Sequence, residues 1–213
     1  MYIQSITELK GMVSVTLCGG NDAFETFSVS VGRLKRLSVP LAEGMTVGEE
    51  LYTEIEHAAA VTEAVRYAAQ ILSASDKSAR MLKRKLTEKG VSDAAAGDAV
   101  EFMVRKGYLD EERQAAAYAE SAVRSKLHGK RRISKELYAR GYDPAVIRQT
   151  LDELSDEDCH AAMRKYLDKI LAKSYNVGNK EIRRIAAAAE RLGHAPGDAV
   201  RYLKERAADG SDR

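Results

Sequence analysis

Three segments between residues 78 and 137 decide the fold of this chain: LKRKLTEKGV (Leu82–Val91), RKGYLDEER (Arg105–Arg113) and KRRISKEL (Lys130–Leu137). Each contains the end or the start of a predicted helix. A glycine directly after a helical segment favours the left-handed conformation that ends a helix, and carboxylates in a first turn stabilise the positive end of the helix dipole. The segments therefore predict a unit of helices separated by glycine turns.

The same pattern of apolar residues and a glycine recurs at intervals of 51 or 52 residues. In each copy, apolar residues lie eight and four positions before the glycine, and another lies ten positions after it. The three sets are Leu82, Leu86, Gly90 and Val100; Ile133, Leu137, Gly141 and Leu151; and Ile185, Ala189, Gly193 and Leu203. Self-similarity at this period is typical of stacked helical units that share a core. Three matched glycines argue against a coincidence between unrelated amphipathic helices.

The first 75 residues have a different character. Residues 2–9, 12–18 and 24–31 are rich in β-branched residues and partly alternate, which predicts a short antiparallel meander. Thr46 and Glu49 have the spacing of a capping box, which predicts a helix that opens at Thr46 and runs to about Ser73. The sequence leaves open whether this segment is one helix or two, with any break placed at residues 57–60.

These patterns predict a mainly α protein with a small N-terminal antiparallel β region and tandem three-helix repeats. The predicted parts are an N-terminal β-containing extension (1–45), a connecting helical segment (46–75), a first helical repeat (76–129), a second (130–177), and a degenerate third repeat with a C-terminal tail (178–213). Ser75 or Asp76 is the predicted cap of the helix that ends at Lys89, and Asp93 is the predicted cap of the next.

The composition is that of an ordinary soluble protein, with 31% charged and 45% hydrophobic residues. The first residues show no basic start followed by an apolar block, so no signal peptide is predicted. No apolar run approaches the roughly 20 residues that span a bilayer. Cys18 and Cys159 form no CxxC motif and are expected to be reduced thiols. We therefore expect a cytoplasmic protein without a membrane partner.

Positive charge is concentrated in the middle of the chain. Residues 1–76 hold 5 Lys and Arg against 10 Asp and Glu, whereas residues 77–140 hold 16 against 9. A local cationic excess indicates a polyanion or an acidic protein surface as a partner; a merely solvated helix face is the alternative. The candidate partner-binding or DNA-binding residues are Arg80, Lys83, Arg84, Arg124, Lys126, Lys130, Arg131, Arg132 and Lys135.

Tyrosines are interleaved with these cations. Tyr108, Tyr118, Tyr138 and Tyr142 could stack on bases, although packing between helices is the expected role of most tyrosines at helical spacing. No catalytic site, metal site or cofactor is predicted. The four histidines have no cysteine or carboxylate partner at a metal-site spacing, and the chain has neither a phosphate-binding GxxxxGK[ST] motif nor a GxSxG motif. We therefore predict a binding protein and not an enzyme.

The segments Lys85–Val91, Gly107–Arg113 and Arg132–Leu137, the last followed by Gly141, resemble the RecX family of regulators of the RecA recombinase. The resemblance covers about residues 66 to 205. The chain departs from the family pattern at Gln114, where a Phe is usual, and at His194. The resemblance implies tandem three-helix repeats in an elongated curved array, in a protein expected to be a monomer. It also implies binding along the RecA–single-stranded-DNA filament, with inhibition of strand exchange and of ATP hydrolysis.

Two other function classes stay open. A stand-alone helical nucleic-acid-binding module of helix-turn-helix type would suit the glycine turns, and it could contact single-stranded or duplex DNA. The helices after Gly90 and Gly141 begin with Asp93-Ala94-Ala95 and Asp143-Pro144-Ala145, which offer no set of base-reading side chains. The other alternative is a helical-repeat scaffold for a different protein.

Overall fold

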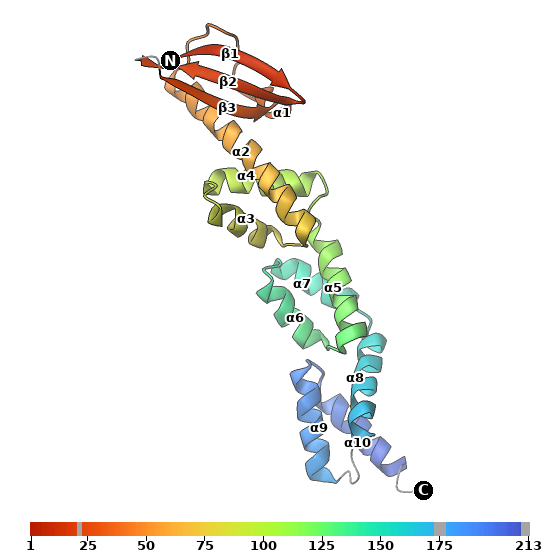
Figure 1. Cartoon of the computed structure of the whole chain (residues 1–213). Helices are drawn as coiled ribbons and strands as arrows, with labels where there is room; N and C mark the ends of the chain where they lie inside the picture. The colour runs from red at the N-terminus through yellow and green to blue at the C-terminus, as the bar shows by residue number, and fades with distance from the viewer. Residues whose placement is uncertain (21–22, 173–177, 210–213) are drawn as a thin grey trace. The chain divides into compact units, whose positions relative to one another are not determined.

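The computed structural model describes residues 1–20, 23–172 and 178–209, and it divides into two compact units, Met1–Leu109 and Asp110–Arg213. Within the described residues the chain forms three strands followed by ten helices (Figure 1). The prediction of a mainly α protein with a small N-terminal antiparallel sheet is confirmed.

The first unit begins with a three-stranded antiparallel sheet. Strands β1 (Tyr2–Leu9), β2 (Met12–Cys18) and β3 (Phe24–Ser30) pair in the order β1-β2-β3. Alternate residues point to one face, so Val13, Val15 and Leu17 are buried on the same side of β2. This face packs against the start of helix α2, where Leu51 and Ile55 are buried in the same core. A single helical turn, α1 (Val31–Leu34), follows β3.

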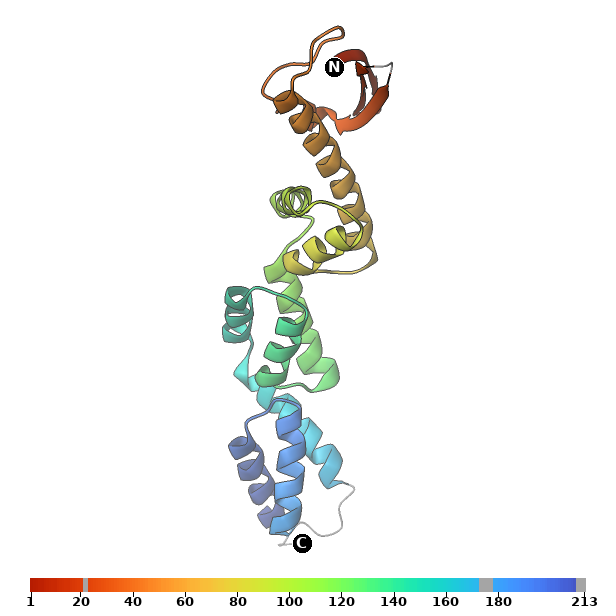
Figure 2. The same cartoon turned by 90° about the vertical axis from the view of Figure 1, so that its left-hand side faces the viewer.

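Helix α2 (Glu49–Ala74) is one continuous helix of 26 residues, without a break at residues 57–60. It does not open with the predicted capping box. The N-cap is Gly48, because Thr46 pairs with Tyr2 in a β-bridge and the Val47 N–H donates to the Met1 carbonyl. The helix begins only after the chain leaves these contacts with β1. Its first half packs on the sheet and its second half packs on α3 and α4 (Figures 1 and 2).

Helices α3 (Ala79–Glu88) and α4 (Asp93–Arg105) complete the first unit, and serines cap both of them. The Ser78 hydroxyl accepts a hydrogen bond from the Met81 N–H at 3.2 Å, and the Ser92 hydroxyl accepts one from the Ala95 N–H at 3.3 Å. The predicted caps at Ser75 or Asp76 and at Asp93 are therefore wrong.

The described residues of the second unit form six helices. They are α5 (Glu111–Lys126), α6 (Lys130–Ala139), α7 (Pro144–Glu153), α8 (Asp156–Leu171), α9 (Asn179–Arg191) and α10 (Pro196–Asp209). Asp110 and Ser155 cap α5 and α8, and acidic residues lie in the first turns of both helices.

Three buried clusters define the helical repeats. Each cluster joins a longer helix to the two helices that follow it, which gives the groups α2–α3–α4, α5–α6–α7 and α8–α9–α10. In the second group, for example, Ala115 and Ala119 of α5 pack with Ile133 and Leu137 of α6. The grouping differs from the predicted boundary after residue 129, which places α5 in the preceding repeat. The predicted end of the second repeat, residue 177, lies outside the described residues.

The glycine turns are alike in all three groups. Gly90, Gly141 and Gly193 have φ of +89°, +84° and +91°. In each turn, the N–H after the glycine donates to the carbonyl of the buried residue four positions before it: Val91 to Leu86, Tyr142 to Leu137 and His194 to Ala189, all at 3.2 Å. These bonds satisfy carbonyls that a helix end leaves unpaired. The predicted register of the repeat pattern is therefore confirmed.

Candidate partner-binding surface

Helix α6 brings together the densest group of predicted cations. Ile133 and Leu137 are fully buried. Arg131 and Lys135 are exposed on another face, where their four-residue spacing makes them neighbours. Among the described residues, no carboxylate lies within ion-pair distance of either side chain. Both charges are therefore open to an anionic partner.

The other two cations of this group have partners within the fold. The Lys130 ammonium lies 2.8 Å from a carboxylate oxygen of Asp156. The Arg132 guanidinium lies 3.1 Å from Glu136 and donates to the Arg191 carbonyl at 3.3 Å. Lys130 and Arg132 therefore also hold α6 against α8 and α9.

A groove of about 830 Å³ runs between α6, α7 and the end of α9. Its cationic lining residues are Lys130, Arg131, Arg132, Lys135 and Arg191, and its acidic ones are Glu136, Asp152 and Glu190. No acidic residue lies in the first turn of α6, so three cations stand where the helix dipole is already positive. The side-chain charges therefore favour an anion in this groove, although the Arg131 N–H is already paired with the Gly193 carbonyl. Arg191 was not predicted, because only folding brings it beside α6.

Two glycines allow α9 to end directly on the start of α6. The Gly129 N–H donates to the Leu192 carbonyl at 2.8 Å, and the Arg131 N–H donates to the Gly193 carbonyl at 3.3 Å. His194 Nε2 donates to the Leu127 carbonyl across 2.9 Å. Carbonyls at the end of one helix thus pair with N–H groups at the start of another. We name these contacts the glycine joint; they fix one wall of the groove.

Glu136 anchors a polar cluster beside the groove. It accepts a hydrogen bond from the Tyr118 hydroxyl at 2.5 Å, and its carboxylate lies 3.3 Å from His128 Nδ1. Burial by itself raises the pKa of Glu136, but hydrogen bonds from Tyr118 and Arg132 and the charges of His128 and Arg132 outweigh it and lower the pKa. Burial lowers the pKa of His128, and Glu136 opposes this effect. Glu136 is therefore held as a carboxylate, and the cluster ties α6 to α5.

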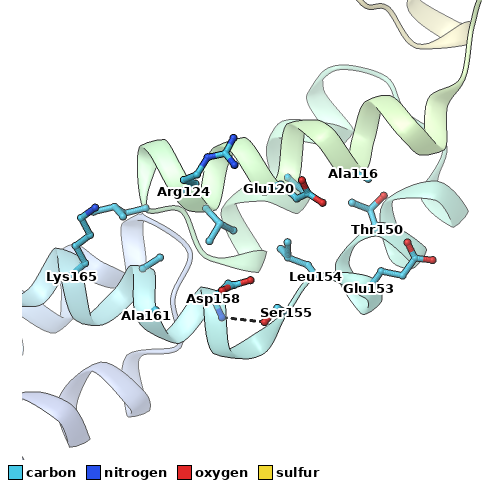
Figure 3. A pocket seen from close by; sticks show the side chains of 14 residues that line it. Ala116, Glu120, Arg124, Thr150, Glu153, Leu154, Ser155, Asp158, Ala161 and Lys165 are labelled. Carbon is cyan, nitrogen blue, oxygen red and sulfur yellow. Dashed lines mark hydrogen bonds between the residues drawn. The ribbon is translucent and has the colours of Figure 1, made fainter.

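The other predicted cations lie elsewhere in the two units. Arg124 lines a different groove of about 540 Å³, between α5, α7 and α8, in which Lys165 also lies (Figure 3). The Lys126 ammonium lies 5.3 Å from the ring centre of Tyr118. In the first unit, Arg80 is exposed on α3, Lys83 pairs with Asp93 at 2.9 Å, and Arg84 pairs with Glu88 at 3.3 Å. The structure thus gathers four of the nine predicted residues in one groove.

Of the four tyrosines that are interleaved with the predicted cations, two pack within the fold and two are exposed. Tyr142 is buried, and its hydroxyl donates to Gln114 at 3.3 Å. Tyr118 is partly buried, and the Arg140 guanidinium lies 4.1 Å from its ring centre. Tyr108 and Tyr138 are 66% and 62% exposed, so their rings are accessible for stacking.

Among the described residues, no three His, Cys, Asp or Glu side chains are grouped so that they could hold a metal ion. Within the same ranges, no helix is both long and apolar enough to cross a bilayer. Cys18 and Cys159 are buried free cysteines.

Residues 110–151, which contain α5, α6 and most of α7, match the family model of the second three-helix domain of RecX. A curated relative from Bacillus velezensis, named Regulatory protein RecX, is 29% identical over 161 residues. One of the same name from Bacillus licheniformis is 27% identical over 157 residues. The chain is therefore similar to RecX proteins in sequence, most specifically over residues 110–151. The matches cover 75% and 74% of this chain but only 60% of each relative, so the chain spans less than two thirds of their length.

Two solved RecX structures share the fold of this chain. The crystal structure of a regulatory protein RecX superposes with a TM-score of 0.75 over 98% of both chains, at 17% sequence identity. RecX from Lactobacillus salivarius gives a TM-score of 0.64 over 70% of this chain and 97% of its own, at 13% identity. The first match includes the N-terminal sheet as well as the helices.

Proposed function

We propose that this protein regulates the RecA recombinase by binding along the RecA–single-stranded-DNA filament, where it inhibits ATP hydrolysis and strand exchange. Sequence similarity to the curated relatives named Regulatory protein RecX carries the proposal. The protein acts as a monomer in the cytoplasm, without a cofactor and without catalysis of its own. The cationic groove on α6 supports contact with DNA phosphates or with an acidic filament surface.

The chemistry of the groove suits this role. Arg131 and Lys135 have no carboxylate partner among the described residues, so an arriving phosphate need not displace an internal ion pair. Three helical groups repeat one packing pattern along the chain. Several modest contacts on one chain add up on a repeating filament, because each later contact is intramolecular.

The test is a charge reversal confined to the open cations. Arg131→Glu with Lys135→Glu should abolish inhibition of the cognate recombinase in ATPase and strand-exchange assays. The matched control is Arg148→Glu with Lys204→Glu, which reverses the same charge on exposed residues of the second unit outside the groove. Circular dichroism should show unchanged helix content in both variants. Full inhibition by the groove variant would exclude the groove from the mechanism.

A stand-alone nucleic-acid-binding module is the second candidate, and the exposed rings of Tyr108 and Tyr138 favour it. It predicts tight binding to DNA alone and no effect on recombinase ATPase beyond competition for DNA. The third candidate, a scaffold for another protein, predicts no DNA dependence. A pull-down against recombinase with and without single-stranded DNA separates the three.

A further inference from the structure

The first unit contains a cavity of about 1140 Å³ that is separate from the α6 groove. Strand β3, helix α1 and the residues after α1 border it on one side, and the last turns of α4 border it on the other. Helix α2 runs between these two sides, since it packs on the sheet at its start and on α4 further along (Figure 1).

Four cations from different elements line this cavity. They are Arg33 of α1, Arg36 in the following turn, Arg66 of α2 and Lys106 at the end of α4. Arg66 pairs with Glu63 at 3.2 Å. For Arg33, Arg36 and Lys106, no carboxylate lies within ion-pair distance in the ranges that the structure describes. The lining carboxylates, Glu56 and Glu63, leave the cavity with an excess of positive charge.

The charges around Arg33 oppose one another. Burial lowers the pKa of Arg33, and the neighbouring charges of Arg36 and Arg105 lower it further, while Asp98 acts in the opposite direction. Like charges in a partly desolvated site repel more strongly than they do in water. A bound anion would replace this repulsion with attraction and would also restore polar contacts that Arg33 loses on burial.

Aromatic and hydroxyl groups accompany the cations. The Arg33 guanidinium lies 6.0 Å from the ring centre of Phe102, and Ser28 and Ser30 of β3 also line the cavity. Unstacked bases stack on aromatic rings and on arginine planes, while cations bind the backbone that joins them. A duplex keeps its bases inside its own stack, whereas a single strand offers a flat base beside every phosphate.

We propose that this cavity binds a short segment of single-stranded nucleic acid, with phosphates on Arg33, Arg36 and Lys106 and a base against Phe102. The site goes beyond the proposed function, because it involves neither α6 nor the recombinase. The charge balance of the sequence does not predict this cationic site, since residues 1–76 carry twice as many acidic as basic residues.

The test measures fluorescence anisotropy of a labelled oligo(dT) with the full-length protein at several salt concentrations. Arg36→Gln with Lys106→Gln removes two exposed cavity charges. The control, Lys10→Gln with Lys89→Gln, removes two exposed charges of the same unit outside the cavity. We expect weaker binding in the cavity variant only, with the magnitude of the log–log salt slope reduced by about 1.4, since each phosphate contact on a single strand contributes about 0.7.

Phe102→Leu tests the stacking independently of charge, and it should weaken binding about tenfold. Thermal unfolding verifies that each variant is folded. Both comparisons are repeated in the Arg131→Glu, Lys135→Glu background. There the cavity variant and Phe102→Leu should still bind oligo(dT) more weakly than their controls, whether or not the α6 groove binds DNA.

Three results would overturn the proposal. The first is equal binding by the cavity variant and its control. The second is unchanged binding by Phe102→Leu. The third is competition by polyglutamate as effective as competition by unlabelled oligo(dT) of equal charge, which would identify a site for acidic peptides.

Discussion

The glycine joint gives the sharpest prediction for the second unit. A Cβ on Gly193 would lie 2.6 Å from the Arg132 Cβ and closer still to the Arg132 backbone nitrogen, at a φ of +91°. Gly90 has nearly the same φ of +89° but nothing within 4 Å of an added Cβ. The pair Gly193→Ala and Gly90→Ala therefore shares the backbone strain and differs in the steric clash.

An alanine in the left-handed conformation lowers the free energy of unfolding by about 1–2 kcal/mol, which is the loss expected for Gly90→Ala. Overpacking against backbone adds a further loss of about 1–3 kcal/mol, so the free energy of unfolding of Gly193→Ala should fall by about 2–5 kcal/mol.

A second pair of variants tests the steric clash without the positive φ. Gly129 and Gly178 are both N-caps with extended backbone, but only an added Cβ on Gly129 meets its neighbours, at 2.5 Å from the Gly193 carbonyl carbon. Gly129→Ala should therefore be destabilising and Gly178→Ala much less so.

Urea unfolding followed by far-ultraviolet circular dichroism measures all four variants against the parent protein. Because the chain has two units, each variant is compared in the transition of the unit that carries the substitution: the first unit for Gly90→Ala, and the second unit for the other three variants. Equal losses for Gly193→Ala and Gly90→Ala, together with equal losses for Gly129→Ala and Gly178→Ala, would refute the close approach of α9 to α6.

Further predictions concern the repeat cores and pH. Leu86→Ala and Leu137→Ala each remove a fully buried side chain and should cost about 2–5 kcal/mol in chemical unfolding; losses near zero would contradict the repeat packing. Burial lowers the pKa of His194 below its ordinary value of 6.5. Below that pH the unfolded chain binds a proton first, so stability should fall, by up to about 1.4 kcal/mol per pH unit for this histidine, until the folded-state pKa is reached. His194→Gln, which keeps a donor for Leu127, should flatten the dependence of the melting temperature on pH between 7 and 5; an unchanged slope would exclude His194 as its source.

The sequence predicts those parts of the fold that depend on neighbouring residues. Alternation identifies β1, β2 and β3, and the glycines at 90, 141 and 193 mark helix ends because few other residues adopt a positive φ. The start of α2 is predicted wrongly, since a bridge between Thr46 and Tyr2 competes with the capping box. A repeat period also defines spacing but not the helix with which a unit begins, so α5 is assigned to the wrong side of its boundary.

The binding surfaces could be predicted only where one helix carries them. Arg131 and Lys135 are adjacent on α6 and are found together in the sequence. Arg191 joins them only through the glycine joint. The cavity of the first unit combines Arg33 and Lys106, which are 73 positions apart in a region of mixed charge. No local pattern can predict a site assembled by packing over such a separation.

Helix α2 belongs to two buried clusters at once, one with the sheet and one with α3 and α4. Consequently, deletion of the N-terminal sheet should destabilise the first helical repeat as well. A chain shortened to begin at Glu49 would expose Leu51 and Ile55 to water, although the second half of the same helix must still pack on α3 and α4. Sheet and first repeat should therefore unfold as a single cooperative block, and slow-exchanging amide protons are expected along the whole length of α2.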